Sequence, residues 1–321
     1  MTRRTTMALA AGVLLAGAMI ASACAPASTT NSDGASGAAS NGASSSIASG
    51  GAAASIPART KEQNAALGRQ HKTAWDLYQA LKAEAKGGQT LAWTNMPDWS
   101  GVFSRPADKG FTFDPDSPAG VLTSAKLTPA FQKKLEQRVA DVKRGIEWDP
   151  ISTCAPPGHP RWLTEPFTRE FVVTPKQTWL INEMVNDIRR IYTDGRDHVP
   201  EEDRYPLYNG DSIGFWDGDA LVIHTNQLQA GIYQRSNPDY TDQVETVEIW
   251  RKADDKTVTA DVWVYDPPAL VEPWYVKQVY GRLSDPDLRI RYWNCAENQN
   301  NNVFKTQDGT TQFKDFTFSG K

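Results

Sequence analysis

The sequence predicts a mainly β fold in which antiparallel strands form a curled sheet or a barrel, with helices at the N-terminal end. From residue 170 onward, apolar and polar residues alternate in short runs, as in strands with one buried face. Turn-forming pairs such as Asp217-Gly218 separate the runs, and no helical pattern intervenes. Short connections join antiparallel neighbours, and a long row of such strands curls or closes on itself.

The first 23 residues have the pattern of a signal peptide. Arg3 and Arg4 precede an apolar run of about 14 residues, which is shorter than the roughly 20 needed to cross a bilayer as a helix. The run ends in small residues directly before Cys24, and this resembles the lipobox of bacterial lipoproteins, in which that cysteine is lipidated. An ordinary signal peptide cleaved near the same place is the alternative.

Residues 24–56 are predicted to form a flexible tether. They are almost wholly Ala, Ser, Gly, Thr and Asn, a composition that cannot bury enough apolar surface to offset its ordering entropy. A tether after a lipidated cysteine would hold a folded domain in the cell envelope, with the lipid anchor as its only membrane contact. Ala25, in place of Asp, favours the outer membrane, with the domain facing the periplasm.

Residues 57–150 are predicted to form a helical part with a first strand. Apolar residues on one helical face predict a single amphipathic helix over residues 60–86. A second helix is expected over residues 129–143, where Thr128 is the predicted N-cap and Pro129 suits the first helical position. A turn entering a short strand lies between them, at residues 97–103.

Residues 151–321 are predicted to form the antiparallel β domain, as a lipocalin-like barrel or curled sheet. Together with residues 57–150 it would make one folded unit. The nine expected strands cover residues 170–174, 177–184, 188–193, 212–216, 220–225, 243–252, 257–265, 275–283 and 288–293.

Composition and motifs exclude several classes of function. A net charge of −4 without a long basic block argues against nucleic acid as a partner. The chain has no Gly-x-Ser-x-Gly elbow, phosphate loop or dinucleotide fingerprint, so no cofactor is expected. Its four histidines show no metal-ligand spacing. The Asp217-Gly218-Asp219 run lacks the full spacing of a calcium loop and is interpreted as a hairpin turn, so no metal site is expected.

Cysteine usage predicts one disulfide. With Cys24 lipidated, Cys154 and Cys295 remain as an even pair in an oxidising compartment. A pair of buried thiols is the alternative.

Five segments of the chain match a known pattern. They are PDWSGVF at 97–103, CAPPGHPR at 154–161, IRRIYTDGR at 188–196, DSIGFWDGD at 211–219 with Leu-Val at 221–222, and CAEN at 295–298. Together these segments resemble a family of secreted β-rich proteins of Gram-negative bacteria. The resemblance implies secretion and β architecture, without a settled activity. Where an aspartate often follows the last Leu-Val strand of this family, the chain has His224.

The stretch from Glu183 to His198 carries the strongest candidates for chemistry. Strand alternation turns one of two adjacent arginines inward, and a buried arginine needs a carboxylate such as Glu183. Arg190 and Tyr192 would then form an anion clamp in the barrel mouth, and a structural salt bridge is the alternative. His198, in a loop, is a candidate general acid–base with Glu183, or else a turn-stabilising imidazole.

Aromatic residues on the expected strands supply the remaining ligand-binding candidates. Trp179, Trp263 and Tyr265 either line a pocket for a sugar or an aromatic ligand or fill the core of the sheet. Glu297, beside Cys295, would lie near His159 if the disulfide forms.

Three functions fit these features. The first is binding of a small amphipathic, aromatic or sugar-like ligand in a barrel cavity. The second is cofactor-free acid–base catalysis, as in a lyase, isomerase or hydrolase, centred on His198. The third is an envelope scaffold that binds a protein or a cell-wall polymer.

Overall fold

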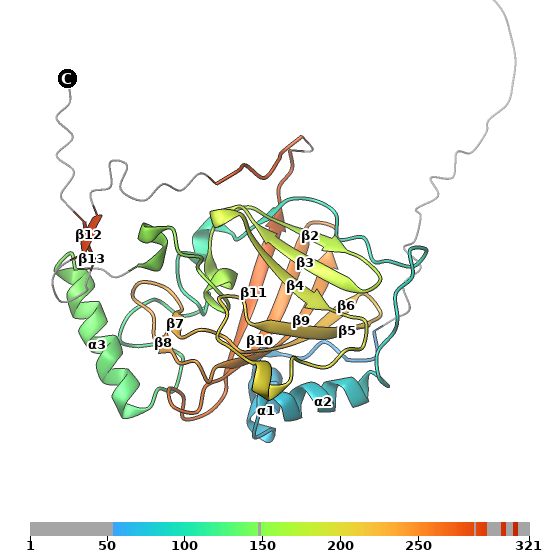
Figure 1. The fold of residues 1–321 in the computed structure, drawn as a ribbon, viewed down its shortest axis with the longest axis horizontal. Coiled ribbons are helices and arrows are strands. Elements are labelled where there is room, and N and C mark those ends of the chain that lie inside the picture. The colour runs from blue at the N-terminus through green and yellow to red at the C-terminus, as the bar shows by residue number, and fades with distance from the viewer. Residues whose placement is uncertain (1–53, 147–148, 286, 294–302, 306–310, 314–321) are drawn as a thin grey trace, which may run out of the picture. The chain divides into compact units, whose positions relative to one another are not determined.

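The computed structural model describes residues 54–146, 149–285, 287–293, 303–305 and 311–313, and its centre is a closed β-barrel (Figure 1). The predicted mainly β fold is therefore confirmed. The barrel strands are β1 (Phe103–Ser104), β2 (Arg169–Val173), β3 (Gln177–Asn182), β4 (Asp187–Tyr192), β5 (Asp211–Asp217), β6 (Ala220–Asn226), β9 (Glu245–Asp254), β10 (Thr257–Tyr265) and β11 (Trp274–Arg282).

The strands follow the order β1–β11–β10–β9–β6–β5–β4–β3–β2 around the barrel, and β2 pairs with β1 to close it. Two short hairpins accompany the barrel, one of β7 (Gly231–Ile232) with β8 (Asp239–Tyr240) and one of β12 (Val303–Lys305) with β13 (Thr311–Phe313). Closure leaves the barrel without a free sheet edge, and it brings strands that are distant in sequence around one interior.

The barrel departs from the predicted strand arrangement in two places. β4 and β5 pair in parallel, whereas all other barrel neighbours are antiparallel, because residues 193–210 form a connection long enough to return the chain to the same end. The strand expected over residues 288–293 is absent, and that segment has no regular structure. Its alternating residues Leu288 and Ile290 lack a barrel partner to pair with, since β1 already occupies the free side of β11.

The single helix expected over residues 60–86 is two helices, α1 (Lys61–Gln70) and α2 (Ala74–Glu84). His71 is extended, and Thr73 begins α2 with a capping box in which Thr73 and Asp76 exchange hydrogen bonds. The apolar pattern of residues 60–86 continues across this break, and it therefore predicts a single helix. The third helix, α3 (Pro129–Lys143), has the predicted bounds, with Pro129 at its first turn.

Helices α1 and α2 cover the outer face of the barrel beside β6, β9, β10 and β11 (Figure 1). Leu77, Tyr78 and Leu81 of α2 belong to one buried cluster with outward-facing residues of these strands. Gly68 of α1 lies so close to the barrel that an added Cβ would stand 2.7 Å from the Trp263 ring. The outer face of these strands is therefore buried.

The barrel interior is filled by side chains. Trp162, Trp216 and Trp250 are fully buried in one cluster that also contains Phe171, and the Trp250 ring stacks on Tyr280 at a centroid distance of 5.4 Å. The short helix η3 (Arg161–Thr164) contributes Trp162 to this interior. Pockets of the described chain must therefore be sought outside this packed centre.

No helix among the described residues combines the length and the apolar character needed to cross a membrane.

Candidate functional site

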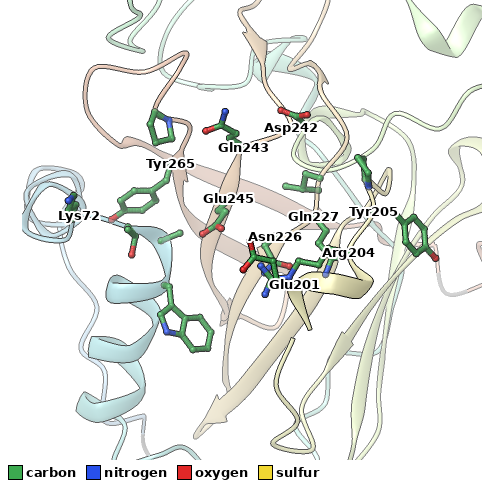
Figure 2. A pocket seen from close by; sticks show the side chains of 16 residues that line it. Lys72, Glu201, Arg204, Tyr205, Asn226, Gln227, Asp242, Gln243, Glu245 and Tyr265 are labelled. Carbon is green, nitrogen blue, oxygen red and sulfur yellow. The ribbon is translucent and has the colours of Figure 1, made fainter. Parts of the chain in front are cut away.

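A pocket of about 620 Å³ lies beside the barrel, between the start of α2, the connection at residues 193–210 and the ends of β6 and β9 (Figure 2). Lys72 and Tyr265 stand on one side of the pocket, Arg204 stands on the other, and Glu245 lies between them. The Trp75 ring, which is 38% exposed, is a further part of the wall. The lining thus offers aromatic faces together with charges of both signs.

Two histidines and two carboxylates form a continuous hydrogen-bonded chain that ends in this pocket. Asp211 Oδ2 lies 2.7 Å from His198 Nδ1. His198 Nε2 lies 2.7 Å from His224 Nδ1, and His224 Nε2 lies 3.3 Å from Glu245 Oε2. His224 is 2% exposed, whereas Glu245 is 36% exposed and lines the pocket. We call these four residues the proton chain.

Strand register explains how the proton chain assembles. In the β5–β6 hairpin Ile213 pairs with His224, so Asp211 and His224 lie diagonally on the same outward face. On the other side of β6, His224 pairs with Val247 of β9, which places Glu245 two residues along that same face. His198 enters from the connection before β5. Pairing of β6 with both β5 and β9 thus gathers four residues that are spread over 48 positions, from 198 to 245.

Aromatic rings of α2 cover the two histidines. The Trp75 ring centroid lies 5.3 Å from that of His224 and 6.0 Å from that of His198, and the Tyr78 centroid lies 5.6 Å from that of His224. Because Ile223 packs into the barrel interior, strand alternation turns His224 outward, where α2 buries it. The imidazole pair is therefore held in a fixed geometry and is shielded from bulk water.

The surroundings of His224 and Asp211 shift the pKa values of these two members of the proton chain. Burial lowers the pKa of His224 below its ordinary value, and the hydrogen bond with Glu245 only partly opposes this. Burial alone would raise the pKa of Asp211, but the hydrogen bonds from His198 and from the Val199 N–H outweigh it, so the pKa of this carboxyl is lowered. At neutral pH the arrangement holds Asp211 ionised and His224 neutral.

Of the predicted acid–base pair, only His198 belongs to this site. Glu183 lies in the turn before the short helix η4 (Met184–Asn186), where it accepts a hydrogen bond of 2.5 Å from the Thr168 hydroxyl. His198 is instead paired with Asp211 and His224. The structure therefore does not bring Glu183 and His198 together.

The predicted anion clamp has a different geometry from the one expected. Arg190 is exposed on the outer side of β4, 5.5 Å from the centre of the Trp179 ring, and Tyr192 is half-buried under the Arg196 guanidinium. The arginine that turns inward is Arg189, which is 1% exposed. Alternation requires one arginine inside but does not say which, because either face of β4 was open to burial.

Arg189 takes its carboxylate partner from across the barrel. Its Nη1 and Nη2 donate to the two carboxylate oxygens of Glu248 on β9, at 3.0 and 2.6 Å, and Nη2 also donates to Thr225. His159 Nε2 lies 3.3 Å from the same carboxylate. Arg189 and His159 hold the pKa of Glu248 well below its usual range despite its burial, while burial lowers the pKa of His159 to about 4. Arg189 and Glu248 are internal to the barrel and do not line the pocket.

The two aromatic candidates on β10 hold helix α1. Trp263 Nε1 donates to the Asn64 carbonyl at 2.7 Å, and the Tyr265 hydroxyl donates to the Gly68 carbonyl at 2.9 Å. Trp263 is fully buried beneath α1, whereas Tyr265 also reaches the pocket wall. Trp263 therefore fills the core, as one of the two alternatives predicted. Tyr265 packs against α1 and also lines the pocket.

The remaining predicted residues lie outside the described part of the chain. Residues 1–53, with Cys24, belong to this group, as do Cys295 and Glu297. Lipidation of Cys24, the Cys154–Cys295 disulfide and a role for Glu297 therefore stay predictions. The end of the expected tether is described, and there the backbone N–H groups of Ser55 and Ile56 donate to the Asp217 carboxylate.

Reasoning from the sequence did not identify Asp211, Glu245 or Trp75, and it did not place His224 beside His198. A signal for part of the site was present, because the Asp217-Gly218 turn fixes the hairpin register that sets Asp211 diagonal to His224. Glu245 and Trp75 carried no such local signal.

No group of three or more His, Cys, Asp or Glu side chains within the described residues is arranged to hold a metal ion. The comparisons with protein-family models, with curated proteins and with solved structures found no match to this chain.

Proposed function

We propose that the protein is an acid–base catalyst that acts on a small amphipathic ligand bound in the pocket beside Glu245. The observation that carries this proposal is the hydrogen-bonded proton chain, Asp211–His198–His224–Glu245, whose only substantially exposed end faces the pocket. A proton taken up at that end can be passed to a buried imidazole, which is what a general base needs.

Counting protons assigns a role to each member of the chain. Three close contacts join the four side chains, and an imidazole without a net charge supplies one N–H proton. Two such imidazoles therefore leave one of the three contacts without a proton. The contact between His224 Nε2 and Glu245 is the longest, at 3.3 Å against 2.7 Å for the other two. We therefore place N–H protons on Nδ1 of both imidazoles, so that the contact between His224 Nε2 and Glu245 is a hydrogen bond once one of these two groups has taken up a proton.

This assignment makes His224 and Glu245 a shared base. Glu245 takes a proton from the ligand, and the proton is then held between its carboxylate and the His224 Nε2. Transfer of that proton to His224 leaves the imidazolium hydrogen-bonded through His198 to the ionised Asp211, which stabilises the positive charge. The reverse transfer delivers the proton to another atom of the ligand, which completes an isomerisation, or to the oxygen of a departing group, which completes an elimination of that group as water or an alcohol. Neither reaction needs a cofactor.

The pocket walls indicate the class of ligand. Trp75 and Tyr265 offer rings for an apolar or sugar face, while Lys72 and Arg204 offer donors and Asn226 offers both a donor and an acceptor. A volume of about 620 Å³ suits a molecule of sugar or aromatic-acid size. The ligand site proposed here lies outside the barrel, because the interior is occupied by side chains.

The test of this proposal is ligand-dependent hydrogen exchange. Sugars, sugar acids and aromatic acids are first screened for an increase in melting temperature. Each hit is then incubated with the protein in D₂O, and deuterium incorporation at carbon is followed by NMR. Exchange of a ligand C–H that requires the protein supports acid–base catalysis; hits that bind without any catalysed proton exchange or turnover contradict it.

We further propose that the protein is a lipoprotein of the cell envelope, held by Cys24 and separated from the membrane by its Ala/Ser/Gly-rich segment. The support is the order of sequence features: Arg3 and Arg4, an apolar run, small residues, the cysteine and the low-complexity segment. The domain would face the periplasm from the outer membrane.

Replacement of Cys24 by serine should release the protein from membranes, because the single thiol that can carry the acyl chains is lost. The measurement is the distribution of the protein between membrane and soluble fractions in a Gram-negative host. Cys154→Ser serves as the matched control and should leave membrane attachment unchanged. Continued attachment of the Cys24→Ser chain would contradict the lipoprotein assignment.

A further inference from the structure

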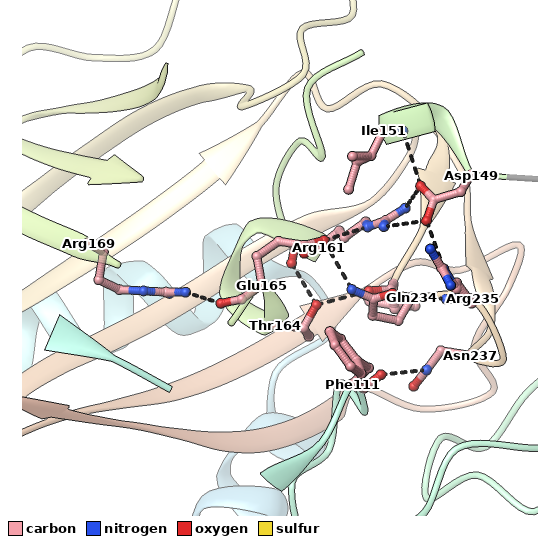
Figure 3. A network of polar contacts seen from close by, with 11 residues as sticks. Phe111, Asp149, Ile151, Arg161, Thr164, Glu165, Arg169, Gln234, Arg235 and Asn237 are labelled. Atoms are coloured by element: carbon pink, nitrogen blue, oxygen red, sulfur yellow. Dashed lines mark hydrogen bonds and ion pairs between the residues drawn. The ribbon is translucent and has the colours of Figure 1, made fainter. Parts of the chain in front are cut away.

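Arg169, at the start of β2, is a fully buried arginine whose guanidinium has no carboxylate in contact. It lies between two aromatic rings, 4.7 Å from the centre of Trp162 and 4.3 Å from the centre of Tyr280. Its Nη2 donates to the backbone carbonyl of Glu165 (Figure 3). Neither Nε nor Nη1 finds a hydrogen-bond acceptor among the described residues. Burial lowers the pKa of Arg169, although Tyr280 and Glu165 oppose the shift.

Carboxylates near this end of the barrel are already engaged by other arginines. Glu165 accepts from Arg161 Nε at 2.8 Å, and Asp149 lies 2.9 Å from Arg161 Nη1 (Figure 3). Both carboxylate oxygens of Glu248 accept hydrogen bonds from Arg189. Arg169 is therefore left as a positive charge without an ionic partner in the described interior.

Two neighbouring side chains also have N–H donors without acceptors among the described residues. Asn182 lies directly opposite Arg169 in the β2–β3 pairing and is fully buried. Its Oδ1 accepts from the Met184 N–H, and its Nδ2 has no acceptor. Trp162, whose ring lies against Arg169, has an unpaired Nε1. Arg105, which is 5% exposed, adds a second positive charge close enough to repel Arg169. The Tyr280 hydroxyl and the charge of Glu165 oppose the burial of Arg169 only in part, and the N–H donors at the site outnumber these acceptors.

We propose that the barrel interior holds one monatomic anion, a halide, beside Arg169 and Asn182. A halide accepts several N–H donors at once and supplies the missing negative charge. A water molecule fits this site less well, because it accepts two hydrogen bonds but brings two further donors and no charge. A larger anion such as sulfate or gluconate does not fit among side chains that are packed around Trp162 and Tyr280. This site is separate from the pocket of the proton chain.

The location of the ion is tested on the full chain, purified, unfolded in urea and refolded in sodium bromide. Crystals of this protein should give a bromide anomalous peak within contact distance of Arg169 Nε. A water molecule, or no density, at that position would overturn the proposal.

The linkage of the ion to folding is tested by urea unfolding at constant ionic strength, with bromide exchanged for gluconate. Above the dissociation constant, each tenfold increase in bromide should raise the folding equilibrium constant about tenfold, because the ion binds only the folded chain. Arg169→Met should abolish this dependence, whereas Arg196→Met, which changes an exposed arginine of the β4–β5 connection, should retain it. A slope that is the same for bromide and gluconate would overturn the proposal. If Arg169→Met fails to fold, the crystallographic result on the unchanged chain decides.

Discussion

Replacement of Arg189 by methionine is expected to lower the free energy of unfolding by about 3–5 kcal/mol, the range found when one partner of a buried ion pair is removed. Arg189 and Glu248 are 1% and 0% exposed, and two hydrogen bonds of 3.0 and 2.6 Å join them. Without Arg189, the Glu248 carboxylate is left in the barrel with His159 and neutral donors only. Urea unfolding followed by tryptophan fluorescence measures the loss.

Arg190→Met is the matched control for this prediction, because it changes the adjacent residue of the same strand in the same way. Arg190 is exposed on the outer side of β4, so the expected change is within about 0.5 kcal/mol. Equal losses for the two variants would mean that the inward and outward faces of β4 are wrongly assigned. A stable Arg189→Met protein would mean that Glu248 does not depend on this arginine.

Replacement of Glu245 by glutamine is expected to reduce the rate of ligand hydrogen exchange by about 10²- to 10⁴-fold, the usual contribution of a general base. The amide keeps the shape of the side chain and the pocket wall, but it cannot take up a proton. The dissociation constant of the ligand should therefore change far less than the rate. The measurement combines deuterium incorporation by NMR with ligand titration by calorimetry.

Glu202→Gln controls for a nonspecific effect of removing one carboxylate from this side of the molecule. Glu202 is exposed in the short helix η5 (Glu201–Asp203) and does not line the pocket. It should exchange the ligand at the rate of the unchanged protein. An unchanged rate in Glu245→Gln would remove Glu245 from the mechanism.

Much of the fold was predictable because it depends on local pattern. The β5–β6 hairpin follows from alternating residues on both sides of Asp217-Gly218, and α3 follows from a helical apolar face that begins at Pro129. The division between α1 and α2 was not predictable from the apolar pattern, because Ala74 and Tyr78 continue the face of α1. The parallel pairing of β4 with β5 depends on the path of residues 193–210, which carries no periodic signal.

The candidate site was less predictable because it is assembled by a loop and by the pairing of β6 with β9, which are not neighbours in the sequence. His198 was identified from its loop position and its chemistry, but its partners come from two strands whose pairing is a long-range property. The same limitation applies to Arg189, whose partner Glu248 is 59 residues away in sequence. The alternation of apolar and polar residues predicts which side chains share one face of a strand. The long-range arrangement of strands around the barrel decides which residues of different strands meet on that face.

¹⁵N NMR of the two imidazoles as a function of pH is the decisive measurement for a shared proton chain from Asp211 to Glu245. We expect Nδ1–H on both His198 and His224, coupling across the His198 Nε2 to His224 Nδ1 hydrogen bond, and a His224 pKa below 6.5, because burial lowers it from that value. A His224 that carries Nε2–H, shows no coupling to His198 and titrates near pH 6.5 would contradict the shared proton chain.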